Sequence, residues 1–514
     1  METDTKEEPR VEQMDGAAAH PDTSHVGVGV YARPKRPPLW YSVRGGILIA
    51  LLASLIFGTR FVAAYIGAGD TLSIHVEQQQ PVTIDLRSAT PRSPYIFGMN
   101  VFPASGTQSV DGAPGFMSYD ASTVKGLTGA GIRMLRFPGG TWGEEHNPSY
   151  AQINAFLRLA QQTHATPMIQ VRLTGGSPEQ AAAMVSYCNN PHDPNRANNP
   201  GVPFVPVHYW EIGNEPDLIG KNYTVADYVR DFIAYATAMK AVDPLIQIMG
   251  PEISQYEGPD APVDATGTPW LSGFLQQIDA YEHQHAVRLL DAVSVHRYPF
   301  GVASRTSPDL LFASPEEWRY AIPLLRAQIR QTMGADLPIA ITEINTSVLG
   351  SSLASPLATS LWWADTLGTL LEERVRYADF FAARGLDQPY NLLHMNGDIT
   401  PLYRVMELYT RMAPDVIQVG TTSGPVSVYV ATNTSRDKLT LMFINKSPAS
   451  AAVTVAPQEM FSHWSSVRFS VPPYAAACIT LHRNGGRGQM AVYGPTPKML
   501  ANGQAGIISV TSLP

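Results

Sequence analysis

From residue 94 to residue 413, short apolar runs alternate with longer segments in which apolar residues recur at helical spacing. A short apolar run bounded by turn residues is consistent with a buried strand, and apolar residues at i, i+3, i+4 and i+7 predict an amphipathic helix. Eight strand-and-helix units of this kind are typical of a (β/α)8 TIM barrel. The expected strands are residues 95–100, 133–137, 167–172, 207–213, 246–250, 292–297, 339–343 and 391–394.

Helical patterns lie between these strands, at residues 150–162, 177–187, 225–242 and 315–332. Two of them begin with Ser-Pro-Glu, at 177–179 and 314–316, which supplies a capping residue followed by proline at the first helical position. A doubly wound open sheet is the alternative α/β architecture. It would carry a glycine-rich nucleotide loop after the first strand, and no such loop follows residue 100, so the pattern favours the barrel.

After Pro414 the helical spacing stops and short alternating strands follow, at residues 426–430, 439–444, 452–455, 467–471 and 477–481. Turns rich in Asn, Ser, Pro and Gly separate them, which predicts an antiparallel β-sandwich domain over residues 414–514. Two further β-prone pieces, 72–76 and 82–86, precede the barrel. We expect residues 70–93 to join the sandwich, and we interpret the sandwich as structural because no aromatic sugar-binding platform stands out in it.

The N-terminal segment differs in character from the rest. Residues 1–44 are rich in Glu, Asp, Pro, Gly and Ala and predict a disordered cytoplasmic tail. Residues 45–69 are mainly apolar, with Arg60 as their one charged residue. Four basic residues precede this segment, Arg33, Lys35, Arg36 and Arg44. This pattern predicts a transmembrane anchor with its basic flank in the cytoplasm. A cleaved signal segment is the alternative. Either interpretation places the barrel outside the cytoplasm, membrane-anchored or secreted.

Composition narrows the classes of partner. Of 514 residues, 44% are hydrophobic and 16% charged, and the formal net charge is −8. An acidic chain is a poor partner for a phosphate backbone, so nucleic acid binding is not expected, and no protein partner is indicated. Cys188 and Cys478 are too few for a disulfide framework and lack metal-ligand spacing, so two free thiols are favoured.

Residues 208–217, His-Tyr-Trp-Glu-Ile-Gly-Asn-Glu-Pro-Asp, place polar groups directly after an apolar strand. Strand alternation puts Glu211, Gly213 and Glu215 on one face, and Pro216 is expected to hold Glu215 extended. Asn214 can donate a hydrogen bond to a sugar 2-hydroxyl, a recurring device in glycoside hydrolysis. The competing interpretation is a strand that ends in an ordinary polar turn.

In a TIM barrel the chemistry lies at the C-terminal ends of the strands. Glu343 ends the seventh expected strand, three strands around the barrel from Glu215, and supplies a second carboxylate. Other polar candidates at strand ends are Arg136, Glu252, His296, Tyr298 and Asn345.

Five motifs together resemble the clan A glycoside hydrolases, most closely family 79, which contains heparanase and β-glucuronidases. They are Arg-Phe-Pro-Gly-Gly at 136–140, Glu-Ile-Gly-Asn-Glu-Pro-Asp at 211–217, Gly-Pro-Glu at 250–252, Ser-Val-His-Arg-Tyr-Pro at 294–299 and Thr-Glu-Ile-Asn at 342–345. The resemblance implies a retaining hydrolase of carbohydrate substrates, with Glu215 as the acid/base and Glu343 as the nucleophile. Such a mechanism needs no cofactor, and no metal motif is present.

A retaining glycosidase must hold two carboxyl groups with different pKa values close together. Arg136 beside Glu343 would keep the nucleophile ionised, with Tyr298 as a hydrogen-bond donor. The alternative for Arg136 is an ion pair with Glu211, and for His296 a satisfied interior histidine is as probable as a substrate contact. Glu252 is the rival acid.

The resemblance implies a β-glucuronide substrate. Members of the family bind the carboxylate of this sugar with a loop that follows the nucleophile. Here that loop is residues 345–352, in which Asn345 and the backbone of Gly350 could meet an anion. It has no tyrosine, and Val348 lies where an aromatic residue is expected, so a neutral β-glucoside, galactoside or xyloside is the alternative. A surface protein that binds glycans without cutting them is the second functional class.

Overall fold

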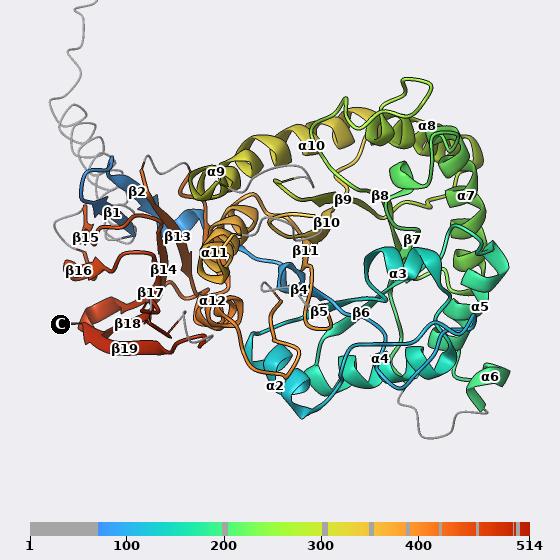
Figure 1. Cartoon of the computed structure of the whole chain (residues 1–514). Helices are drawn as coiled ribbons and strands as arrows, with labels where there is room; N and C mark the ends of the chain where they lie inside the picture. The colour runs from blue at the N-terminus through green and yellow to red at the C-terminus, as the bar shows by residue number, and fades with distance from the viewer. Residues whose placement is uncertain are drawn as a thin grey trace, which may run out of the picture. The chain divides into compact units, whose positions relative to one another are not determined.

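A computed structural model describes residues 70–197, 204–300, 307–348, 354–386, 391–420, 424–458, 462–496, 498–499 and 504–513 (Figure 1). The expected tail and membrane segment, residues 1–69, lie outside this part of the chain. Within the described residues no helix is both long and apolar enough to cross a bilayer. Membrane attachment and export therefore stay predictions.

Eight parallel strands form a closed barrel in the order β10-β11-β4-β5-β6-β7-β8-β9. Closure is shown by β4, which pairs with β5 on one side and with β11 on the other. This confirms the barrel and excludes the open sheet. The strands are β4 (Gly98–Asn100), β5 (Met134–Phe137), β6 (Thr166–Val171), β7 (Tyr209–Ile212), β8 (Gln247–Ile253), β9 (Ala292–Arg297), β10 (Ile339–Ile344) and β11 (Tyr377–Phe380).

The expected eighth strand at residues 391–394 is wrong. The strand that closes the barrel is β11, and residues 391–394 instead form part of a loop beyond it. The two apolar leucines of that loop, Leu392 and Leu393, are buried against the outside of the barrel. Burial of a loop thus gave the same apolar signal as a strand.

Helices surround the barrel on its outside (Figure 1). The helix α7 (Val225–Val242) has the expected bounds, and Ser177 caps α5 (Pro178–Asn189) by accepting from the Gln180 amide. The helix expected from residue 315 begins later, because a 3-10 turn, η4 (Ser314–Glu317), precedes α10 (Trp318–Met333). The others are α2 (Ala121–Gly129), α3 (Gly140–Glu145), α4 (Tyr150–Thr163), α6 (Pro194–Ala197), α8 (Trp270–His285), α9 (Pro308–Ala313), α11 (Pro356–Glu372) and α12 (Pro401–Tyr409).

The barrel interior changes from apolar to polar along the strands. A small apolar cluster contains one residue from most strands, Met134, Met168, Tyr209, Met249, Ala292, Ala340 and Tyr377. Two residues further along the same strands, the buried side chains are Arg136, Gln170, Glu211, Ser294, Thr342 and Asp379. Because inward positions alternate along a strand, these two sets form successive layers. The polar layer lies toward the C-terminal ends of the strands and supports the site.

The remaining strands form two antiparallel sheets, ordered β16-β15-β1-β2 and β19-β18-β17-β14-β13-β12-β3. One apolar cluster includes Ile74 from the first sheet and Val428 and Leu441 from the second, so the sheets pack as a sandwich. Strand β1 pairs antiparallel with β15. The bounds are β1 (Thr71–Val76), β2 (Val82–Asp85), β3 (Thr90–Pro91), β12 (Asp415–Ile417), β13 (Val426–Thr432), β14 (Lys438–Asn445), β15 (Ala451–Pro457), β16 (Val467–Val471), β17 (Ala475–His482), β18 (Gly488–Tyr493) and β19 (Ile508–Leu513).

Polar contacts join helix α11 to the second sheet. Tyr429 donates to the Asp365 carboxylate at 2.6 Å, and the Lys446 ammonium lies 2.5 Å from the other oxygen of Asp365. Both partners are buried, so breaking either bond would leave an unpaired polar group inside. Cys188 and Cys478 are both buried and unpaired.

Candidate active site

Glu215 and Glu343 meet at the C-terminal end of the barrel, where they line one cavity of about 610 Å³. Glu343 belongs to β10, and Glu215 lies three residues beyond the end of β7. One oxygen of each carboxylate and one ring nitrogen of His296 lie within 4.8 Å of one another. So close an approach of the two carboxylates is in keeping with the roughly 5 to 5.5 Å between the carboxyl groups of retaining glycosidases, which is shorter than the roughly 6.5 to 9.5 Å of inverting ones.

The backbone of Glu215 is left-handed, with φ 48° and ψ 56°, and not extended as Pro216 led us to expect. Gly213 also has a positive φ, 78°, so the chain turns sharply out of the strand. The Glu215 amide donates to the Glu252 carbonyl at 2.9 Å. A non-glycine residue keeps this uncommon conformation only where its surroundings impose it, and here the hydrogen bond to the neighbouring strand does so.

Arg136 and Tyr298 hold the Glu343 carboxylate. The Arg136 guanidinium lies 3.1 Å from one oxygen of Glu343, and the Tyr298 hydroxyl donates to the other. The same guanidinium pairs with Glu211 at 2.7 Å. Arg136 therefore makes both contacts that the sequence suggested, one with Glu343 and one with Glu211. Its planar guanidinium has enough N–H donors for both carboxylates.

The pKa values of this cluster reflect burial and opposing charges. Burial raises the pKa of Glu343, while His296 and Arg136 act against that rise and Glu215 adds to it. Burial alone would lower the pKa of Arg136, but Glu211, Glu252 and Glu343 raise it above its usual value. Arg136 is thus a permanent cation beside Glu343, and it opposes the neutralisation of this carboxylate that burial favours.

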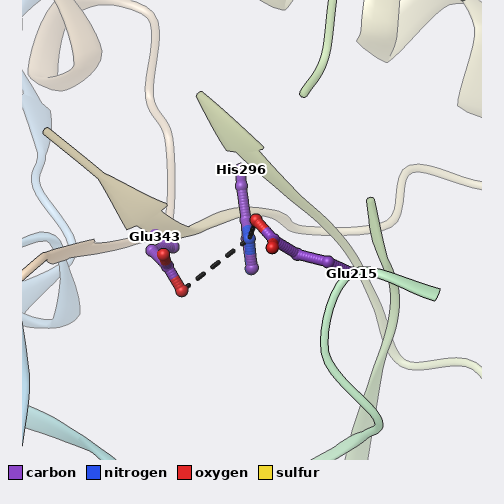
Figure 2. Close-up of side chains that lie close together, drawn as sticks. All are labelled: Glu215, His296 and Glu343. Carbon is purple, nitrogen blue, oxygen red and sulfur yellow. Dashed lines mark hydrogen bonds and ion pairs between the residues drawn. The ribbon is translucent and has the colours of Figure 1, made fainter. Parts of the chain in front are cut away.

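His296 lies between the two carboxylates (Figure 2). Its Nδ1 is 3.0 Å from Glu215 and 3.8 Å from Glu343, and its Nε2 is 3.1 Å from Glu252. Burial alone would lower the pKa of His296, but Glu343 and the hydrogen bonds to Glu215 and Glu252 raise it to about 10. The surrounding carboxylates therefore favour the imidazolium form of His296 at neutral pH.

Glu215, His296 and Glu343 are also the one group among the described residues whose spacing could hold a metal ion. A metal ligand must be a neutral imidazole, whereas the three carboxylates around His296 favour its protonated form. The three side chains are therefore better suited to exchanging protons than to binding a metal ion. It provides two carboxyl groups for acid, base and nucleophilic chemistry.

Two expected substrate contacts and the rival acid lie away from the cavity surface. Arg136 and His296 were expected to contact substrate, but both side chains are fully buried and lie behind the carboxylates. Glu252, the rival acid, is fully buried too and does not line the cavity. These three residues lie behind Glu215 and Glu343 and do not line the cavity.

The other expected contacts differ in their positions. The Asn214 side-chain oxygen accepts from Arg136 at 2.9 Å, which orients its amide. Asn345 and Tyr298 line the cavity, although the Asn345 amide already donates to the Phe381 carbonyl. Gly350 lies outside the described residues.

Two supporting residues were not expected. Glu144 accepts from the Asn214 amide at 3.2 Å and from the Thr174 amide at 2.6 Å, which ties α3 to the loops after β6 and β7. Gln255 accepts from the Tyr298 amide at 2.8 Å and lines the cavity. Each makes its contact across sequence-distant loops, so no local pattern could have identified it.

Replacing Tyr298 with Phe removes the hydroxyl that lowers the pKa of Glu343. We expect this pKa to rise further, so that the acidic limb of kcat/KM moves to higher pH, because the nucleophile must be ionised. The value of kcat/KM at the optimum should fall by roughly 10- to 100-fold, the cost of a hydrogen bond to a charged group. A pH–rate series on wild type and variant checks this, and an acidic limb in the wild-type position would contradict it.

Comparisons with known proteins agree with this geometry. A profile of glycoside hydrolase family 44 matches residues 179–300. A β-xylosidase of Geobacillus stearothermophilus is 28% identical over 221 residues, 40% of each chain. The α-L-arabinofuranosidase C of Emericella nidulans is 28% identical over 155 residues, 28% of each chain. The chain thus matches less than half the length of these two relatives.

A likeness over nearly the whole fold comes from a solved structure. The family 51 arabinofuranosidase of Xanthomonas axonopodis pv. citri aligns with a TM-score of 0.61 at 15% identity, covering 86% of this chain and 94% of that one. The barrel and the paired glutamates resemble those of clan A glycoside hydrolases, and the proteins that this chain is similar to are glycoside hydrolases. The closer resemblance to family 79 stays a prediction, because the relatives described above are of other kinds.

Proposed function

We propose that this protein is a retaining glycosidase that acts on a neutral sugar, most simply a β-xyloside or an α-L-arabinofuranoside. Glu343 attacks the anomeric carbon and forms a glycosyl-enzyme, while Glu215 protonates the leaving oxygen. Glu215 then activates the water that releases the sugar. The short separation of the two carboxylates supports this double displacement.

The assignment of a neutral sugar as substrate rests on one observation about the cavity. Its described lining includes the carboxylates of Glu215 and Glu343 but no Lys, Arg or His side chain. A uronic acid would bring a further negative charge to the wall that holds the Glu343 carboxylate, and burying an unpaired charge is costly. Aromatic side chains, Phe102, Phe116, Trp142 and Phe381, provide apolar surface for the carbon–hydrogen faces of a sugar.

A β-glucuronide is the second candidate, and the resemblance to family 79 is the observation that favours it. Val348 weakens that case, because it lines the cavity where such relatives use an aromatic hydrogen-bond donor. A pentoside substrate gains support from the similarity of the sequence to a β-xylosidase and an α-L-arabinofuranosidase.

The test compares kcat/KM on aryl β-xyloside, α-L-arabinofuranoside, β-glucoside and β-glucuronide that share one leaving group. We expect kcat/KM on a pentoside to exceed that on the glucuronide by at least about 100-fold, since no cationic side chain of the described residues lines this cavity to pair with the uronate. The variant Val348→Arg adds a cation to the wall and should narrow this ratio. A preference for the glucuronide would overturn the neutral-sugar assignment, and turnover of no glycoside would favour a glycan-binding protein.

A further inference from the structure

Glu252 is a buried carboxylate that the proposed reaction does not use directly. It lies near the end of β8, has no exposed surface and does not line the catalytic cavity. One of its oxygens accepts from His296 at 3.1 Å and from the Thr342 hydroxyl at 2.6 Å, with the Arg136 guanidinium at 3.5 Å. Of the two cationic groups that contact it, His296 is therefore the nearer.

Glu252 also holds the backbone of Glu215. Its carbonyl accepts from the Glu215 amide at 2.9 Å, and both residues are left-handed, with φ 59° at Glu252 and 48° at Glu215. The Glu215 side chain is held in turn by His296 at 3.0 Å. One residue thus contacts the acid/base twice, directly through the backbone and indirectly through an imidazole ring.

The hydrogen bonds of His296 require a particular charge state. A neutral imidazole has one donor nitrogen and one acceptor nitrogen, whereas an imidazolium has two donors. Both ring nitrogens of His296 face carboxylate oxygens, of Glu215 and of Glu252. Only the imidazolium donates to both when these carboxylates are ionised, and Glu252 supplies a buried counter-charge on the side away from substrate.

We propose that Glu252 is a positioning residue, which keeps His296 protonated so that its Nδ1–H fixes the carboxylate of Glu215 in line with the leaving group. This inference rests on the proposed function, since it assigns a part in the acid/base step. The charged and titratable groups that face the pair are Arg136, Glu211, Glu215, Tyr228, Glu343 and Asp379.

The balance of those groups explains why Glu252 matters. Burial would lower the pKa of His296, and the surrounding carboxylates raise it to about 10. Arg136 already pairs with Glu211 and Glu343, and its distance to Glu252 is longer, 3.5 Å. Arg136 therefore neutralises Glu252 only weakly. Without the Glu252 charge, only Glu215 and Glu343 would be left to keep His296 protonated. The proposed reaction neutralises each of these two carboxylates in turn, so neither provides a constant charge.

The test is Glu252→Gln in the full-length protein, which keeps the backbone carbonyl and the side-chain shape. We expect the alkaline limb of kcat/KM, which follows loss of the Glu215 proton, to move to higher pH by about one unit or more, because a neutral His296 no longer donates a charged hydrogen bond to ionised Glu215. We also expect kcat/KM to fall roughly 10- to 100-fold for a poor leaving group and little for a good one, because only the poor one needs protonation.

Glu257→Gln is the matched control, an exposed glutamate in the segment after the same strand. Adding Glu252→Gln to His296→Gln should cost little more than His296→Gln alone, since residues that act through one another are not additive. Equal losses on both leaving groups with an unmoved pH profile would show a merely structural role and overturn the proposal. Wild-type turnover is measured first, so that loss of the proposed function is recognised separately.

A second measurement does not depend on the folding of Glu252→Gln, because it uses the wild-type protein. Nitrogen-15 NMR of histidine-labelled wild type, with the His296 signals assigned by their loss in His296→Gln, reports the ring's charge state. We expect both ring nitrogens of His296 to be protonated at pH 7. A neutral His296 ring at that pH would overturn the proposal by itself.

Discussion

Replacing Glu343 with Gln should reduce turnover of an aryl glycoside by at least about 10,000-fold, the scale of loss when a catalytic nucleophile is removed. The amide is nearly the same size and can keep contacts with Arg136 and Tyr298, so the fold should survive. It cannot form the glycosyl-enzyme, because a neutral amide is a poor nucleophile. Steady-state rates with the thermal midpoint of each protein test this, and a stable variant with substantial activity would contradict the role of Glu343.

Glu215→Ala is the contrasting variant for the same account. It should retain activity on substrates whose leaving groups need no protonation, and added azide should restore turnover by replacing the water that Glu215 activates. Azide should not rescue Glu343→Gln in this way. Equal and unrescuable losses in both variants would contradict the division of roles.

Replacing Arg136 with Met should lower the free energy of unfolding by about 3–5 kcal/mol, the cost of removing one partner from a buried ion pair. The guanidinium is fully buried and contacts Glu211 at 2.7 Å and Glu343 at 3.1 Å. Its loss leaves these carboxylates without their nearest cation. Activity should fall with stability, because the pKa of the nucleophile rises when Arg136 is gone.

The destabilisation should depend on pH in a definite direction. Burial already raises the pKa of Glu211 to about 8 in the folded protein, and loss of Arg136 raises it further. A carboxyl group with a raised folded pKa loses stability as pH rises from its unfolded value near 4.5 toward the folded one. Wild type and variant lose this stability equally up to about pH 8, where Glu211 ionises in the wild type alone, so the extra deficit of the variant should grow above about pH 8 in urea unfolding. Arg158→Met, an exposed change on α4, should be neutral, and a pH-independent deficit would contradict the charge argument.

The pattern of apolar runs predicted seven of the eight barrel strands and failed at the last. Strand β11 reads Tyr-Ala-Asp-Phe and follows the charged end of α11, so Asp379 made it look like a polar connection. Asp379 is nevertheless fully buried, because it belongs to the polar layer of the barrel interior. Periodicity assumes an apolar inside, and a barrel that supports an active site departs from that assumption.

The candidate site shows a similar division. Glu215 and Glu343 could be predicted because each ends a strand, and parallel strands in a barrel end at the same face. The burial of Arg136 and His296 could not be predicted, since a strand pattern does not say how deep a side chain lies. The left-handed backbone of Glu215 was also beyond local reasoning, because a hydrogen bond to Glu252 on another strand imposes it.

The most direct test of the central claim is the anomeric configuration of the first sugar released, followed by proton NMR during hydrolysis of the preferred aryl glycoside. Carboxylate oxygens within 4.8 Å of each other leave no room for a water between the sugar and Glu343. The account predicts that the first product retains the configuration of the substrate. A first product of inverted configuration would contradict the double displacement through Glu343.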